Sequence, residues 1–180
     1  MEHHPIFKNF QPWSGKCSTD YIVNFLGVFI KKEYILNFNP KPPPIPQENF
    51  IKTDYPEFDH SYHEMISLLE AVVNTKDKFT MIELGAGIGH QVIQAAAAIR
   101  AYHGSEFPFK LIAVEGEPTA FKWMKNHFEK NNVDPTAHEL IEAVVSDKDG
   151  SVLFEVGHPE GFGSFVVSPF RYFTNPLRWV

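Results

Sequence analysis

The sequence contains a single cysteine, Cys17, so no disulfide can form within the chain. A lone thiol is typical of proteins in a reducing compartment, and the polar start at residues 1–4 lacks the pattern of a signal peptide. We therefore expect a cytoplasmic location. No apolar run reaches the roughly 20 residues that a membrane helix needs, and the apolar stretch at 21–30 is interrupted by Asn24.

Basic residues are also scarce. The chain has 16 lysines and arginines against 22 acidic residues, which gives a net charge of −6. Such a balance disfavours an electrostatic surface for nucleic acid. We expect a small molecule as the partner, with no nucleic acid and no membrane. The 180 residues suit one core-forming unit, since 43% of them are hydrophobic.

Aromatic residues and prolines divide the chain. Residues 1–38 form an extension too rich in aromatic residues to be a disordered tail, and its stretch at 21–36 is strand or helix by periodicity. Residues 39–59 form a connector that begins with a proline-rich run. Residues 60–180 carry the remaining elements and are predicted to form the main domain.

The most informative stretch is residues 79–90, where an apolar strand contains Glu83 near its end and three alternate glycines follow. Gly85, Gly87 and Gly89 allow a sharp turn and a close approach of the backbone to a ligand. A helix that starts directly afterwards points free N–H groups at that ligand. The stretch predicts a loop for a nucleotide-type cofactor; the alternative is a purely structural turn from strand to helix.

A second strand, 110–115, ends in another acid, Glu115. The helix predicted between the strands, 88–103, makes the gap from Gly85 to Glu115 longer than the roughly 20 residues of a dinucleotide-binding fold. A right-handed βαβ unit places Glu115 beside the glycine loop, where it could accept hydrogen bonds from ribose hydroxyls. The alternative is a solvated strand end.

Other patterns complete an α/β fold with a parallel core sheet in the strand order three-two-one. Ser61 and Glu64 have the spacing of a capping box at the start of a helix ending near residue 74. His60 and His63 lack further ligands, so we expect no metal site. The remaining predicted elements are a helix beginning at Pro118, a third strand at 139–146, a hairpin-paired strand at 151–156 and a short strand at 165–167.

Taken together, the chain resembles the FkbM-type methyltransferases, which use S-adenosylmethionine (SAM). The matching stretches are 68–72, 79–89, 114–118 and 143–150, with 13–15 and 25–28 similar to an N-terminal extension of a bacterial subgroup. The resemblance implies a Rossmann-like fold and methyl transfer to a hydroxyl oxygen of a sugar, polyketide or related metabolite.

The resemblance also implies the cofactor residues. Glu83 would steady the glycine loop or the amino group of the methionine moiety, and Glu115 would hold the ribose. Glu142 would accept from the adenine amino group or is an ordinary exposed acid. His90 would line the pocket or pack at the helix start. The full predicted set is Glu83, Gly85, Ala86, Gly87, Gly89, Glu115, Gly116, Glu142 and Ala143.

Members of that family continue into a second half of the sheet, which nothing in this sequence matches. We therefore expect this chain to hold the cofactor half, to leave the catalytic residues unassigned, and to self-associate through an open edge beside the first strand. A minimal acceptor pocket built with His158 is the competing expectation. The alternative functions are a nicotinamide-dependent dehydrogenase and a non-catalytic module that keeps the SAM fold.

Overall fold

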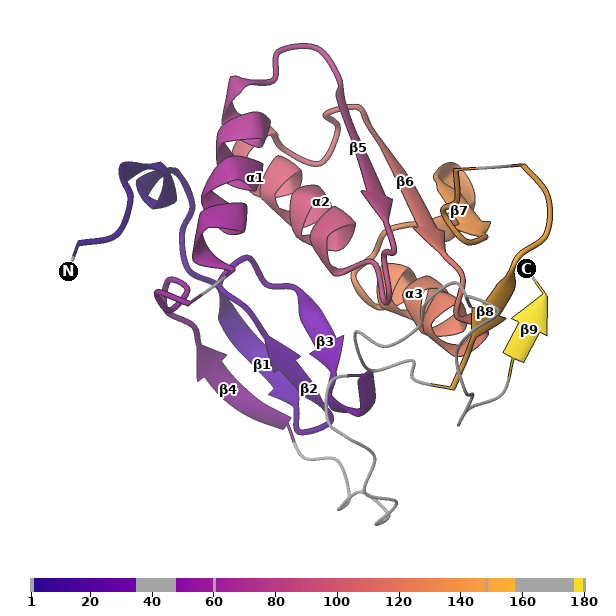
Figure 1. Cartoon of the computed structure of the whole chain (residues 1–180). Helices are drawn as coiled ribbons and strands as arrows, with labels where there is room; N and C mark the ends of the chain where they lie inside the picture. Colours follow the sequence, from indigo (N-terminus) through magenta and orange to yellow (C-terminus); the bar gives the residue numbers. More distant parts are fainter. Residues whose placement is uncertain (1, 35–47, 60, 148, 158–176, 180) are drawn as a thin grey trace.

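A computed structural model describes residues 2–34, 48–59, 61–147, 149–157 and 177–179. Its centre is a three-stranded parallel sheet (Figure 1). The strands lie in the order β5-β6-β7, which confirms the predicted order three-two-one. Their bounds are Phe79–Leu84 for β5, Phe109–Glu115 for β6 and Glu139–Glu142 for β7. This mixed α/β arrangement is compatible with a Rossmann-like fold.

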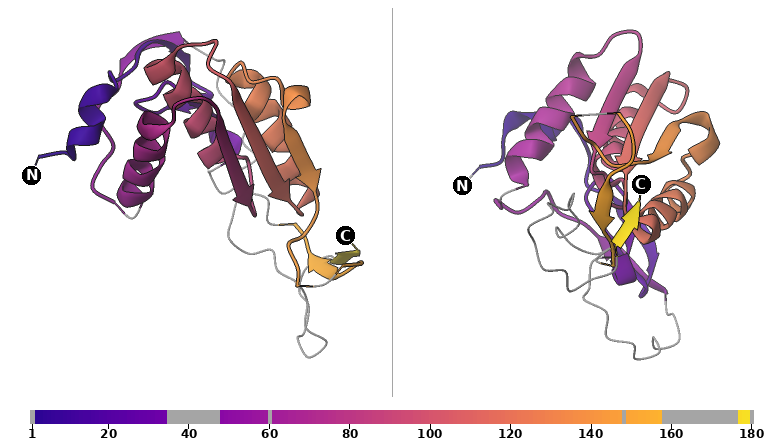
Figure 2. Two further views of the ribbon diagram at one scale, coloured as in Figure 1. Left: turned by 90° about the horizontal axis from the view of Figure 1, so that it is seen from above. Right: turned by 45° about the vertical axis from the view of Figure 1, so that its right-hand side comes forward.

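Three helices cover one face of the sheet (Figure 2). Alternate strand residues such as Leu111 and Ala113 are fully buried under them. The predicted apolar stripe of α3 is confirmed, because Met124 and Phe128 are fully buried and Pro118 is the first residue of the helix. The helices are α1 (Tyr62–Asn74), α2 (His90–His103) and α3 (Pro118–Lys130).

The predicted capping box at the start of α1 is wrong. Ser61 has helical backbone angles, and its side chain makes no cap hydrogen bond. Its hydroxyl instead donates to Asp59 Oδ1 at 2.8 Å. The Glu64 carboxylate accepts a hydrogen bond from the side-chain amide of Gln91 at 3.1 Å, which links α1 to α2. Ser61 and Glu64 therefore form hydrogen bonds with Asp59 and with α2, and the spacing of residues within the predicted box cannot show such partners.

The N-terminal segment folds into short strands. Periodicity left strand and helix as alternatives at 21–36, and the structure has two strands and a 3-10 turn there as far as residue 34. Strand β4 lies inside the range predicted as a connector and pairs with β1 in an antiparallel sheet. The bounds are η1 (Pro5–Asn9), β1 (Ser14–Ser18), β2 (Tyr21–Val23), β3 (Phe29–Lys31), η2 (Lys32–Tyr34) and β4 (Glu48–Lys52).

This segment shares its core with the helices. Phe7, Phe10 and Phe25 are buried in one cluster with Leu69 of α1 and Ile99 of α2. Rings of this size remove a large apolar area from water, so the contact contributes strongly to stability. The aromatic content of the extension therefore reflects packing against the α/β part.

The predicted strands after α3 are shortened and re-paired. The third strand ends at Glu142 and not at residue 146. The next strand, β8 (Leu153–Glu155), pairs antiparallel with β9 (Leu177–Trp179), so the expected local hairpin is wrong. The partner of β8 is a strand more than 20 residues further along the chain, and the pattern of residues around β8 alone cannot show this pairing. The strand predicted at 165–167 lies outside the described residues.

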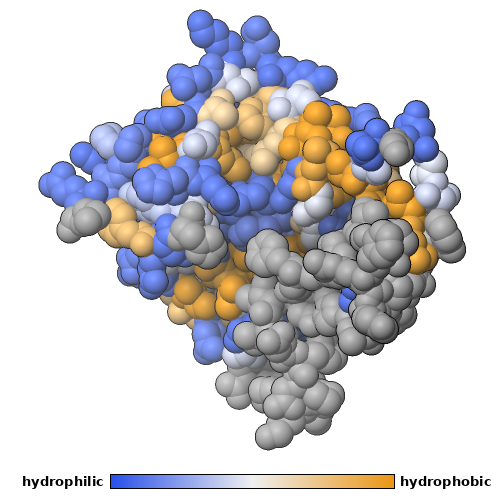
Figure 3. Space-filling model, viewed as in Figure 1, coloured by the Kyte–Doolittle hydropathy of each residue, from blue (hydrophilic) through white to orange (hydrophobic). Residues whose placement is uncertain are grey.

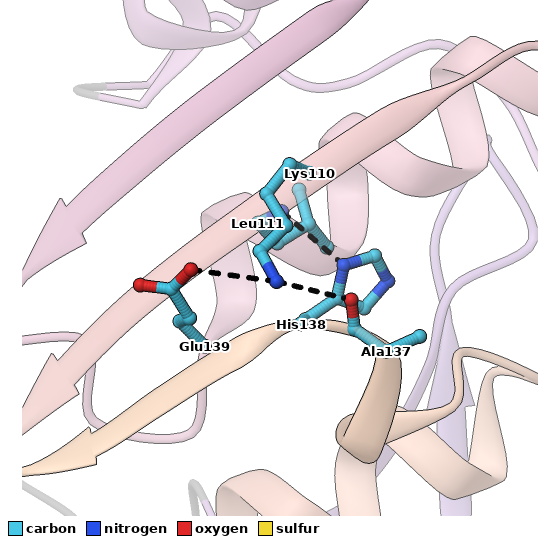
Figure 4. A network of polar contacts seen from close by, with 5 residues as sticks. All are labelled: Lys110, Leu111, Ala137, His138 and Glu139. Carbon is cyan, nitrogen blue, oxygen red and sulfur yellow. Dashed lines mark hydrogen bonds and ion pairs between the residues drawn. The ribbon is translucent and has the colours of Figure 1, made fainter.

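A side chain extends the β6–β7 pairing before β7 begins (Figure 4). The Leu111 amide donates to His138 Nδ1 at 3.3 Å, one residue ahead of Glu139. Lys110 reaches across as well, to the Ala137 carbonyl at 3.2 Å and to the Glu139 carboxylate at 3.5 Å. The turn η3 (Pro135–Ala137) thereby delivers β7 in register with β6.

The other face of the sheet is apolar and open. Ile82 and Leu84 of β5 are 59% and 60% exposed, and Ile141 of β7 is 41% exposed. Figure 3 shows hydrophobic surface where these strands lie in Figure 1. The two faces of one sheet therefore differ in what covers them.

Candidate functional site

The glycine loop joins β5 to α2 and turns through three left-handed positions. Gly85, Gly87 and Gly89 have φ values of 69°, 54° and 69°. A Cβ added at Gly85 or Gly87 would meet no atom within 4 Å, so that side of the loop is open. A Cβ at Gly89 would lie 3.0 Å from Met124. The first two glycines thus border space for a ligand, and the third allows close packing on α3.

Glu83 lies in β5, two residues before this loop, and its side chain caps the start of α2. Its Oε2 accepts from the Val92 amide at 3.1 Å. Burial, with a smaller contribution from the nearby Glu115, raises the pKa of Glu83 to about 7, although the backbone amides of Val92 and Gln91 act in the opposite direction. This contact fits the first of the two predicted roles, steadying the loop.

Glu115 is the last residue of β6, and its carboxylate accepts hydrogen bonds from the glycine loop and from the residue that precedes α3. Its Oε2 accepts from the Gly87 amide at 2.7 Å, and its Oε1 accepts from the Glu117 amide at 2.6 Å. The residue is only 8% exposed. A carboxylate offers about four lone-pair sites, and these two amides use two of them. The predicted pairing of Glu115 with the glycine loop is therefore present.

Glu142 is the last residue of β7, Ala143 follows it, and both lie beside Glu115. Glu142 is the register partner of Glu115 on the neighbouring strand, and it is exposed. The Ala143 amide donates to the Glu115 carbonyl at 3.1 Å. The structure thus places all three predicted acids, Glu83 included, at the carboxyl ends of adjacent strands.

Ala86 and Gly116 have structural roles at the same edge. Ala86 is buried, and its amide donates to the Val114 carbonyl at 2.9 Å, which binds the loop to β6. A Cβ on Gly116 would lie 2.5 Å from Val144 and 3.2 Å from Phe154. A glycine at 116 lets the chain after β7 and strand β8 pack on the end of β6.

Two histidines flank the loop: His127 is buried, and His90, which alone was a sequence candidate, is partly buried. His90 begins α2 and stacks on His127 of α3, with ring centroids 6.4 Å apart. Burial lowers the pKa of His90 to about 4 and also lowers that of His127, so both rings are neutral near pH 7. His127 Nδ1 lies 2.9 Å from the Ile88 carbonyl of the loop. A polar residue in the buried stripe of α3 was the available signal for His127.

A separate groove of about 430 Å³ lies between the N-terminal segment and α3. It contains two lysines among aromatic rings, and Lys130 Nζ sits 4.4 Å from the Tyr21 ring centroid. None of its lining residues belongs to the predicted cofactor set. They are Tyr21, Phe29, Lys31, Tyr34, Asn126, His127, Glu129 and Lys130.

No family model, curated protein or solved structure matches the chain. The resemblance to FkbM-type enzymes therefore stays a prediction. Across the described residues, no helix is long and apolar enough to cross a membrane. The same part of the chain holds no group of three or more His, Cys, Asp or Glu side chains able to bind a metal. His60 and His158 lie outside the described residues.

Proposed function

We propose that this chain binds SAM at the glycine loop and serves methyl transfer to a hydroxyl of a small-molecule acceptor. The observation that carries the proposal is the 2.7 Å hydrogen bond from the Gly87 amide to the Glu115 carboxylate. It joins the two predicted halves of a nucleoside site at one edge of the sheet. The open side of Gly85 and Gly87 leaves room beside them.

The charge of this edge favours a cationic cofactor. In phosphate-binding loops, backbone amides and a helix start receive the phosphate oxygens. Here the Gly87 amide already donates to the Glu115 carboxylate, and Glu142 adds a second acid at the same edge. A pyrophosphate would be repelled, which counts against a dinucleotide. SAM carries a positive sulfonium and no phosphate.

The residues present fit such a group. Glu115 would accept from the ribose hydroxyls with its remaining lone pairs, and Glu142 would accept from the adenine amino group. Glu83 fixes the start of α2, and the backbone at Gly85 and Gly87 approaches the ligand closely because neither residue carries a Cβ. When bound, SAM supplies an activated methyl group, so the protein's task is to bind and position.

Calorimetric titration with S-adenosylhomocysteine tests the proposal. The parent chain is expected to bind, and Glu115→Gln is expected to bind about tenfold more weakly, because hydrogen bonds to charged groups contribute roughly 1.5–3 kcal/mol. Glu129→Gln, on an exposed part of α3, is the matched control and should bind as the parent does. Titration with NAD should give no heat of binding.

Failure of the parent to bind would contradict the proposal, and so would equal affinities of the parent and Glu115→Gln. Transfer of labelled methyl to a panel of sugar and polyketide hydroxyl acceptors then separates an enzyme from a non-catalytic SAM module. A chain that binds but transfers no methyl group to any acceptor supports the module.

A further inference from the structure

The N-terminal segment and the glycine loop share one apolar cluster, in which Val28 and Ile30 are buried together with Ala86, and both also contact α3. His127 and Asn131 lie one helical turn apart at the end of that helix. His127 is 1% exposed, and Nδ1 lies 2.9 Å from the Ile88 carbonyl, so the ring N–H donates to the loop. Carbonyl oxygens accept only, which fixes this tautomer.

Asn131 makes the contact on the other side. Its Oδ1 accepts from the Phe29 amide at 2.8 Å, and its Nδ2 donates to the Phe29 carbonyl at 3.0 Å. The same Nδ2 lies 2.8 Å from the His127 carbonyl. The side-chain amide thus holds both backbone groups of Phe29 in β3 and joins them to the turn that carries His127.

The backbone of α3 is itself held at this point. Arg100 of α2 donates to the carbonyls of Asn131 and Asn132 at 2.9 and 2.7 Å. These are carbonyls at the helix end, which lack partners within the helix. The end of α3 is therefore fixed to α2, to β3 and to the glycine loop at once.

We propose that His127 and Asn131 form a hydrogen-bonded bridge through which the N-terminal segment positions the glycine loop. Its importance for cofactor binding rests on the proposed function, whereas the bridge itself does not. His127 and Asn131 act as positioning residues, since neither is among the groups placed to touch a ligand. The N-terminal segment is then part of the site, although it contributes no cofactor residue.

The bridge predicts a specific pattern of hydrogen exchange in the ligand-free chain. Leucine and asparagine have nearly the same shape, and asparagine places its amide N–H close to where His127 carries Nδ1. In His127→Leu, amide exchange at residues 87–89 should rise about tenfold, because a hydrogen bond to the loop is lost. In His127→Asn it should stay within about threefold of the parent, since the donor is retained.

Two further variants separate the bridge from general destabilisation. Val72→Ala removes buried volume in α1, away from the bridge, and should leave exchange at 87–89 unchanged relative to β6. Asn131→Asp keeps the acceptor for the Phe29 amide and loses both donors. It should raise exchange at 87–89 and also at 29–31, which tests the bridge even if His127→Leu fails to fold.

Equal loop exchange in His127→Leu and His127→Asn would overturn the proposal, as would a rise in Val72→Ala that matches His127→Leu. Affinity for S-adenosylhomocysteine should follow the same order, weakened about tenfold by leucine and restored by asparagine. If the parent binds no S-adenosylhomocysteine, the proposed function is contradicted and the exchange data still decide the bridge.

Discussion

The two faces of the central sheet are built from the same strands and differ in their surroundings. On the helix-covered face, Leu111 and Ala113 are fully buried. On the opposite face, Ile82, Leu84 and Ile141 are more than a third exposed. Hydrophobic character alone therefore says little about stability in this sheet, because the packing partner decides what each side chain contributes.

The largest expected effect comes from matched leucine truncations on the two faces. Leu111→Ala should lower the free energy of unfolding by about 2–5 kcal/mol, because it opens a cavity under the helices. Leu84→Ala is the same chemical change on the exposed face and should stay within about 0.5 kcal/mol. Urea denaturation of both variants measures the difference. Comparable losses would show that the exposed face is covered in solution.

The second effect is a pH dependence of stability that arises from Glu83, next to the glycine loop. The folded pKa of Glu83, about 7, exceeds its unfolded value of 4.5, so the folded state holds the proton more tightly. Stability from this group is complete below pH 4.5 and is lost as the pH rises toward 7. The variant Glu83→Gln keeps a neutral acceptor for Val92 and should avoid this loss.

The stability gain of Glu83→Gln over the parent should therefore grow from pH 4.5 to 7 and then level off, at about 3 kcal/mol or less. Urea titrations at pH 5, 6, 7 and 8 follow this difference. The effects of His90 and His127 cancel in the comparison, because both proteins carry these histidines, whose lowered pKa values cost stability as the pH falls below 6.5. A gain independent of pH would contradict the raised pKa.

A third, smaller effect compares the two sides of the loop. Gly85 and Gly89 share a φ of 69°, so alanine at either pays a similar left-handed strain of about 1–2 kcal/mol. Gly89→Ala should cost about 1 kcal/mol more, since its Cβ crowds Met124 and Phe128 at 3.0 and 3.1 Å. Thermal unfolding resolves this gap. Equal costs would mean that α3 yields to the added methyl.

The smallest effect concerns the two acids at the sheet edge. Glu142 is the register partner of Glu115, and like charges on neighbouring strands repel. Glu142→Gln should raise the unfolding free energy by about 0.5 kcal/mol or less at low salt, and the gain should fade in 1 M salt. A loss of stability on this substitution would indicate that attractive contacts of Glu142 outweigh the repulsion.

Much of this architecture was predictable because it is encoded locally. The strand-glycine-helix order at 79–90 and the acid at Glu115 specify a βαβ unit, and both lie where expected. The absence of a capping box at Ser61 and the strand partner of β8 were not predictable, because they depend on Asp59 and on a strand far along the chain. The contact of His127 with the glycine loop was not predicted for the same reason, because its partner Ile88 lies far from it in the sequence.

The bond between Phe29 and Asn131 joins residues 102 positions apart. During synthesis, at roughly 5–20 residues per second, the N-terminal strands leave the ribosome several seconds before α3 exists. Their aromatic rings must wait in water, or on a chaperone, until the helices that bury them have been made. The N-terminal segment can therefore make its contacts with α3 only after that helix has been synthesised.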